Sequence, residues 1–221
     1  MPRIARIVGV GYPHHIVQRG NNREKVFLEW RDYEKYLSFL ERYSKGKKAA
    51  ILAYCLMTNH VHLLVIPSDE KTLAKMMQGV ALCYTQHFNR EKGRTGRLWE
   101  CRYHSNVIDG DSYLWTVSKY IENNPVRAGI VKRPEDYPYS SAKAHILDRN
   151  DPLLNGHLFS KSELKEYRRF MKLEEDKKIL EEIRKRMRLG KPLGDEGFIQ
   201  NLSEKIGYNL SFRGRGRPRR S

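Results

Sequence analysis

The sequence predicts an α+β fold in which one antiparallel sheet carries two helices on the same face. Three observations predict this fold. Four short apolar or alternating stretches are separated by two helical patterns, and two of these stretches are joined too tightly for anything but a hairpin. The third is size, because 221 residues with 39% hydrophobic content can form one sizeable domain and an appendage.

The first half of the pattern contains a strand, a helix and a second strand. Alternating side chains predict the first strand at residues 14–19, with turn residues directly after it. Helical spacing of tyrosines and leucines then begins at Asp32, which can cap a helix, and ends at Gly46, which can stop one. The strand over residues 50–57 passes through a two-residue turn into a third strand, so these two form an antiparallel hairpin.

The second half repeats the helix and the strand. A helix is expected over residues 70–90, and a basic, glycine-rich loop follows at 89–97. A strand at 103–108 completes the order β-α-β-β-α-β, which is the order of ferredoxin-like folds. An added helix over 111–123 is expected to stop at Pro125, because the residue before a proline is pushed away from helical angles.

The strong positive charge indicates a polyanionic partner. The chain has 42 Lys and Arg against 26 Asp and Glu, a formal charge of +16, which makes nucleic acid the first candidate. The longest apolar stretch, residues 49–57, is too short to span a membrane, and the N-terminus does not have the pattern of a signal peptide. We therefore expect no membrane partner and a cytoplasmic location of bacterial type, in association with the nucleoid.

Two histidines, His60 and His62, stand two residues apart in the third strand. Side chains alternate across a strand, so both imidazoles point to the same face. Two ring nitrogens on one rigid face can share a metal ion, and the apolar run that follows would hold their backbone in place. The alternative is a pair of surface histidines or satisfied core histidines. The motif alone leaves both interpretations open.

A phenol and a carboxamide lie near the end of the added helix. Tyr120 and Asn124 are four residues apart and share one face of the last turn if the helix continues that far. A tyrosine phenol ordinarily has a pKa of about 10, so it needs a positive centre nearby to act as a nucleophile at neutral pH. The alternatives are a packing tyrosine and an asparagine that caps the helix C-terminus.

Several separate motifs occur in order between residues 12 and 144: PHHIVQRGNNRE, YCLMTNHVHLLV, GRLWECRYHS, YIENNPVRAGIV and YPYSSAKAH. With them the chain resembles the REP-associated tyrosine transposases, a branch of the HUH single-tyrosine transposases. The resemblance implies that His60 and His62 are ligands of a divalent metal and that Tyr120 is the nucleophile. Asn124 falls where the family offers a third polar ligand.

The resemblance implies a DNA transposase or endonuclease that cleaves and rejoins single-stranded or hairpin DNA through a 5′-phosphotyrosine intermediate. Its substrate would contain palindromic repeats. The metal would be Mg²⁺ or Mn²⁺, and imidazole ligands shift the preference toward Mn²⁺. One alternative is a noncatalytic DNA-hairpin-binding protein derived from such an enzyme, and another is a nuclease that uses water. The sequence leaves open whether the protein is a monomer or a homodimer.

Arginines and aromatic residues are interleaved after the second helix. Such a mixture is suited to neutralising phosphates and stacking on unpaired bases, which favours single-stranded or hairpin DNA. The alternative is that the aromatic residues belong to the core and the arginines to a solvated rim. The residues predicted to bind DNA in this part of the chain are Arg94, Arg97, Trp99, Arg102, Tyr103 and Arg127.

The composition changes near residue 146, which predicts a catalytic domain over 1–146, a helical accessory region over 147–212 and a basic tail over 213–221. Apolar stripes predict helices at 161–188 and 195–206, which can form a small module or pack on the main domain. The tail contains RGRGRPRR without an acid, so it is expected to be disordered when free. It resembles an AT-hook or is a nonspecific basic tail, and the predicted DNA contacts there are Arg213, Arg215 and Arg217.

Overall fold

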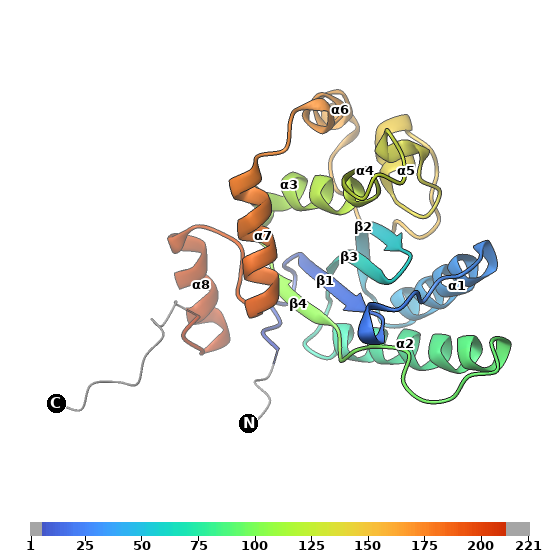
Figure 1. The fold of residues 1–221 in the computed structure, drawn as a ribbon. Coiled ribbons are helices and arrows are strands. Elements are labelled where there is room, and N and C mark those ends of the chain that lie inside the picture. The colour runs from blue at the N-terminus through green and yellow to red at the C-terminus, as the bar shows by residue number, and fades with distance from the viewer. Residues whose placement is uncertain (1–5, 211–221) are drawn as a thin grey trace.

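A computed structural model describes residues 6–210, so the predictions for Arg213, Arg215 and Arg217 lie outside the described residues. Four strands form one antiparallel sheet in the order β2-β3-β1-β4 (Figure 1). The β-α-β-β-α-β order predicted from the sequence is confirmed. The strands are β1 (His14–Arg19), β2 (Ala50–Met57), β3 (His60–Ile66) and β4 (His104–Val107).

Two helices, α1 (Trp30–Gly46) and α2 (Thr72–Glu91), cover one face of the sheet. Alternate strand residues such as Ile16 and Leu63 form the core beneath them. The predicted cap of α1 is wrong, because the helix begins two residues before Asp32. The Asp32 carboxylate lies in the first turn and accepts from the backbone N–H of Glu29 at 3.1 Å, so Glu29 is the cap.

The opposite face of the sheet is covered by α3 (Gly110–Glu122), which packs on β2 and β3 (Figure 1). The helix predicted over 111–123 is found within one residue at either end, but the prediction that Pro125 stops it is wrong. It ends at Glu122, and after Asn123 a short helix, α4 (Asn124–Arg127), begins. Pro125 lies in the first turn of α4, where a missing N–H costs nothing and the fixed φ of proline suits a helix.

The C-terminal helices pack on the main domain. The predicted helical region 161–188 is broken at 173–176, where Asp176 caps a new helix by accepting from the Lys178 N–H at 2.8 Å. Tyr167 and Ile183 are completely buried in the same core as α3 and β2. The helices of this part are α5 (Ala142–Leu147), α6 (Leu164–Lys172), α7 (Lys177–Leu189) and α8 (Glu196–Ile206).

The segment between α7 and α8 reaches the outer edge of the sheet at the end of β4. Leu193 donates its N–H to the carbonyl of Val107 at 2.9 Å and accepts from the N–H of Asp109 at 2.8 Å. An uncovered edge strand would expose backbone groups that could pair with another chain, so this segment protects the sheet edge. None of the helices in residues 6–210 is long and apolar enough to cross a membrane. Three short 3-10 turns complete the structure, Asn21–Arg23, Pro134–Asp136 and Lys161–Glu163.

Candidate active site

The paired histidines of β3 lie on the face of the sheet that α3 covers. Their ring centroids are 5.0 Å apart. His62 is opposite Val17 of β1 and Cys55 of β2, so it lies in the interior of the sheet and only 5% of it is exposed. His60 begins β3 and is partly exposed. One imidazole is therefore fixed by the core, and the other stands where the site opens.

A third imidazole, His15 of β1, joins this pair, and the sequence did not predict its role. Its Nε2 lies 2.9 Å from Nδ1 of His62, and the two rings stack with centroids 5.2 Å apart. His15 is in β1, next to β3, and its side chain points to the same face. Alternation within the first strand could have placed His15 on one face, but only the pairing of β1 with β3 brings it to His62.

Tyr120 reaches the same cluster from α3. Its ring meets the rings of His15 and His62 edge to face, with centroids 5.7 and 5.8 Å apart. Helical spacing explains this position, because Val117 and Ile121, on the same side of α3, are completely buried in the core. The phenol ring is thus held against the imidazoles by the packing of the helix that carries it.

All three imidazoles are neutral at pH 7. Burial lowers the pKa of His60 to about 4 and that of His15 to about 3. It also holds the pKa of His62 well below its usual range, with smaller contributions from the neighbouring imidazoles and arginines. A neutral imidazole is the form that binds a metal, so protonation does not compete with a cation near neutral pH.

The donor atoms of His60 and His62 fit a divalent cation. Nδ1 of His60 lies 2.6 Å from the Asn59 side-chain oxygen, and Nδ1 of His62 is hydrogen-bonded to His15. When each Nδ1 carries the proton of its hydrogen bond, both Nε2 atoms offer a lone pair, which is the usual arrangement of metal-binding histidines. The described residues contain no cluster of three His, Cys, Asp or Glu side chains that could complete such a site.

Asn124 caps α3. Its Nδ2 donates to the carbonyl of Tyr120 at 3.0 Å and to that of Ile121 at 3.1 Å. Arg127 also donates to the Tyr120 carbonyl, and its guanidinium carbon lies 4.5 Å from the centre of the Tyr120 ring. These contacts give Asn124 and Arg127 a structural role at the end of the helix. The predicted role of Asn124 as a metal ligand stays a prediction.

The aromatic residues predicted to bind DNA are buried. Trp99 is 8% exposed and packs with the aromatic core under α1 and α2. Tyr103 is 7% exposed, and the Arg6 guanidinium carbon lies 3.8 Å from its ring centre. Neither ring has an open face of the size that an unpaired base requires in this conformation.

The arginines predicted to bind DNA fall into two groups. Arg94 pairs with Glu24 at 3.3 Å, Arg97 donates to the Asn21 side chain at 3.0 Å, and Arg127 pairs with a carboxylate oxygen of Glu175 at 2.6 Å. The exposed Arg102 differs, because its side chain makes no hydrogen bond or ion pair within residues 6–210. Among the described residues, Arg102 is thus the member of the set whose guanidinium has no hydrogen-bond or ion-pair partner.

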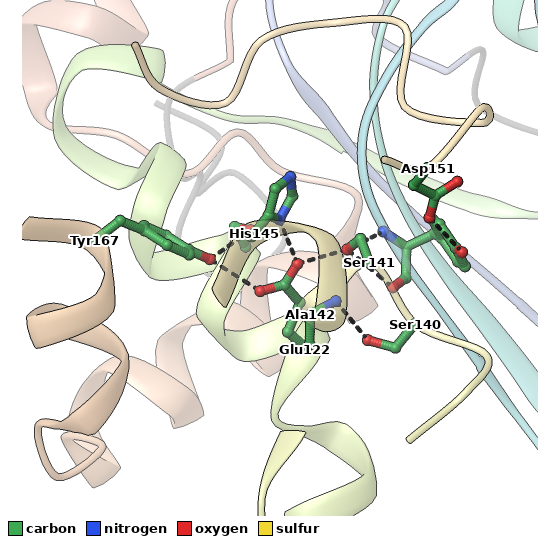
Figure 2. Close-up of polar contacts among 9 residues, drawn as sticks. Glu122, Ser140, Ser141, Ala142, His145, Asp151 and Tyr167 are labelled. Carbon is green, nitrogen blue, oxygen red and sulfur yellow. Dashed lines mark hydrogen bonds and ion pairs between the residues drawn. The ribbon is translucent and has the colours of Figure 1, made fainter. Parts of the chain in front are cut away.

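A second polar cluster begins only two residues after Tyr120. The completely buried carboxylate of Glu122 accepts from Ser141 at 2.5 Å, from Nδ1 of His145 at 2.6 Å and from the Tyr167 hydroxyl at 3.0 Å (Figure 2). Tyr167 also lies 3.0 Å from the Ser118 hydroxyl oxygen. These bonds tie α3 to α5 and α6, so the helix that carries Tyr120 is anchored from its far side.

Comparison with known proteins identifies relatives that are described as transposases. A protein from Haemophilus influenzae, assigned by name to the REP-associated tyrosine transposases, is 30% identical over 100 residues, which cover 41% of this chain and 57% of that protein. The chain thus matches little more than half the length of this relative. A solved structure described as a REP-associated tyrosine transposase bound to a REP hairpin superposes with a TM-score of 0.55 and 18% identity.

That solved structure is covered to 96% and covers 73% of this chain, which establishes the common fold. The family model described as "Transposase IS200 like" matches residues 10–124. The matched range contains all four strands, the three clustered histidines, and Tyr120 with Asn124. More than half of the sequence lies within this match, and the chain therefore belongs to the IS200-like transposase family.

Proposed function

We propose that this protein cleaves and rejoins single-stranded or hairpin DNA through a covalent bond between the DNA and Tyr120. The observation that carries the proposal is the position of the Tyr120 ring against the rings of His62 and His15. A nucleophile and a pair of metal-binding side chains from two distant segments meet on one face of the sheet. Membership of the transposase family supports the same chemistry.

His60 and His62 would hold Mg²⁺ or Mn²⁺ through their Nε2 atoms, and His15 would orient His62 through the 2.9 Å hydrogen bond. Held there, such a cation would supply a positive centre for the scissile phosphate. The position of the nucleophile is set by residues of the chain. The packing of α3 holds the phenol in place, and the Arg127 guanidinium packs over its ring, with its carbon 4.5 Å from the ring centre.

The proposed step exchanges one phosphate ester for another. The Tyr120 oxygen bonds to phosphorus, the bond from phosphorus to the 3′ oxygen breaks, and the proton lost by the phenol is balanced by the proton that the 3′ oxygen gains. The products are a 5′-phosphotyrosine and a free 3′-OH. A second 3′-OH can attack the phosphotyrosine and rejoin a strand, so the cycle needs no nucleotide cofactor.

The proposed substrate is a hairpin formed by palindromic repeats, with cleavage in nearby unpaired DNA. The formal charge of +16 supports a polyanionic partner, and the solved relative is described as bound to a REP hairpin. The test is to mix the protein with hairpin DNA that is labelled at its 3′ end, with and without Mn²⁺. We expect labelled DNA to become covalently attached to protein, resistant to denaturant, only when the metal is present.

One alternative function is a noncatalytic hairpin-binding protein. The observation that favours it is that the described residues contain no cluster of three His, Cys, Asp or Glu side chains that could hold a metal. Tight binding of the hairpin without cleavage under any metal would support this alternative. Cleavage without a covalent adduct would instead indicate a nuclease that uses water. Each of these results contradicts the tyrosine mechanism in a different way.

A further inference from the structure

A basic cavity lies at the outer edge of the sheet, beside the start of β4. Its volume is about 420 Å³, within the range of ordinary ligand sites. It is formed by four segments, namely the N-terminal segment, the loop before β4 with the start of that strand, the C-terminal end of α7, and the residues after α8. The charged residues that line it are Arg6, Arg97, Arg102, Arg188, Lys191 and a single acid, Glu100.

The positive charge of this cavity is poorly compensated. Neither Arg102 nor Arg188 makes a hydrogen bond or an ion pair in the part of the chain that the structure describes, and both are exposed. Arg6 donates to the backbone carbonyl of Tyr103 at 2.9 and 3.0 Å, so its guanidinium is held in place without a carboxylate. An arginine fixed in this way keeps its charge for an anion.

An aromatic ring completes the lining. Tyr208, two residues after the end of α8, is 55% exposed and borders the cavity. Proteins that bind single-stranded nucleic acid combine such rings, which stack on bases, with arginines that contact the backbone. Bases in a duplex are already stacked on their neighbours. The pairing of an exposed ring with unpaired cations therefore favours an unpaired strand.

The cavity and the candidate active site lie on one row of residues that crosses the sheet. His104, which lines the cavity, is opposite Val17 of β1, and Val17 is opposite His62 of β3. Residues directly opposite each other in an antiparallel sheet point to the same face. Two strand spacings amount to about 10 Å, so His104 and His62 share a face at a distance that a strand of one or two nucleotides can cross.

We propose that this cavity binds an unpaired segment of the DNA strand close to the cleavage position. Its phosphates would contact Arg102 and Arg188, with Arg6 behind them, and one base would stack on Tyr208. The inference rests on the proposed function in taking DNA as the substrate. It gives the C-terminal helices a role, since α7 and the residues after α8 supply side chains that the catalytic domain lacks.

The test compares two hairpins with the same duplex, one blunt and one with an unpaired tail, bound by the full-length chain without metal so that no cleavage occurs. Arg188→Ala should weaken binding of the tailed hairpin about fivefold or more and lower the salt slope by about 0.7. Arg184→Ala is the matched control, because this exposed arginine is one turn away on α7 and does not line the cavity. It should change binding less than twofold.

Tyr208 provides an independent variant. Tyr208→Ala should weaken binding of the tailed hairpin and leave the blunt hairpin unaffected, while Tyr208→Phe should bind as the original chain does, because it keeps the ring. Equal effects of Arg188→Ala and Arg184→Ala would overturn the proposal. Equal losses on blunt and tailed hairpins would overturn it as well, since the cavity would then be a general basic surface.

The outcome is separable from the test of the proposed function. If Mn²⁺ produces the Tyr120 adduct but Arg188→Ala binds normally, the cavity assignment fails and the tyrosine chemistry stands. If no adduct forms but the tailed hairpin depends on Arg188 and Tyr208, the chemistry fails and the binding assignment stands.

Discussion

Two polar clusters lie on either side of the same turn of α3, and they differ in how completely their atoms are paired. Around Glu122, both carboxylate oxygens accept hydrogen bonds, and the three donors come from Ser141, His145 and Tyr167. Around Tyr120, Nδ1 of His15 is buried without a partner among the described residues.

The difference separates a structural cluster from a functional one. A buried network whose polar atoms are all paired stabilises the fold and has little to offer a ligand. The imidazole cluster beside Tyr120 leaves a buried ring nitrogen without a partner among the described residues, and a buried polar atom without a partner costs stability. The presence of a buried charged group does not by itself mark a functional cluster. The buried carboxylate of Glu122 belongs to the structural cluster, which ties helices together.

The largest expected effect is on the functional cluster. Tyr120→Phe removes only the attacking oxygen, so the covalent adduct should disappear completely while the fold and DNA binding are kept. Tyr113→Phe, on the same helix, is the control and should form the adduct normally. The measurement is the yield of protein linked to labelled hairpin on a denaturing gel. Adduct formation by Tyr120→Phe at the original rate would show that another group attacks.

The next effect is on the structural cluster. Glu122→Ala leaves three buried donors without their acceptor, so the free energy of unfolding should fall by about 3–5 kcal/mol. Glu166→Ala, an exposed glutamate on α6, is the control and should change it by less than about 0.5 kcal/mol. Urea unfolding followed by circular dichroism measures both. A loss below about 1 kcal/mol for Glu122→Ala would mean that the network contributes little to stability.

The affinity for Mn²⁺ of variants that each lack one histidine tests the role of each histidine separately. His60→Ala and His62→Ala should each abolish measurable Mn²⁺ binding in calorimetry, because a single imidazole cannot hold the cation. His15→Ala keeps both ligands but loses the hydrogen bond to His62, so the affinity should fall about 10- to 100-fold. His87→Ala, on α2 beyond the opposite face of the sheet, should leave it unchanged. If His62→Ala binds Mn²⁺ with unaltered affinity, then His60 and His62 are not metal ligands and have a structural role.

The smallest expected effect concerns His14, the neighbour of His15 on the other face. Both its ring nitrogens have polar neighbours, at 3.1 Å from Ser105 and Gly9, and burial lowers its pKa to about 4. The unfolded chain has the ordinary pKa of about 6.5, so the stabilisation is complete above that pH and is lost as the pH falls from 6.5 toward 4. Between pH 7 and pH 5, His14 should account for a loss of about 2 kcal/mol.

The matching variant is His14→Gln, which cannot titrate. The decline in unfolding free energy between pH 7 and pH 5 should be smaller for this variant than for the original chain by about 2 kcal/mol. Identical declines would show that the proton taken up on unfolding goes to other groups.

The sequence alone determined the features that depend on local periodicity. Alternation located β1, β2 and β3 and placed His60 and His62 on one face, because consecutive residues of a strand must point in opposite directions. Helical spacing with Asp195 before it and Gly207 after it located α8, because caps and stripes act over a few residues. The family motifs lie in the same local segments, which is why they were visible before the structure.

Only the tertiary structure decided which distant segments meet. The pairing of β1 with β3 brings His15 to His62, and the packing of α7 on β4 brings Arg188 to the cavity that Arg102 lines. It also placed Trp99 in the core, where the sequence allowed either a buried ring or a DNA contact. Contacts of this kind depend on strand register and on the fit of whole surfaces. These are properties of the assembled chain that no short window of residues specifies.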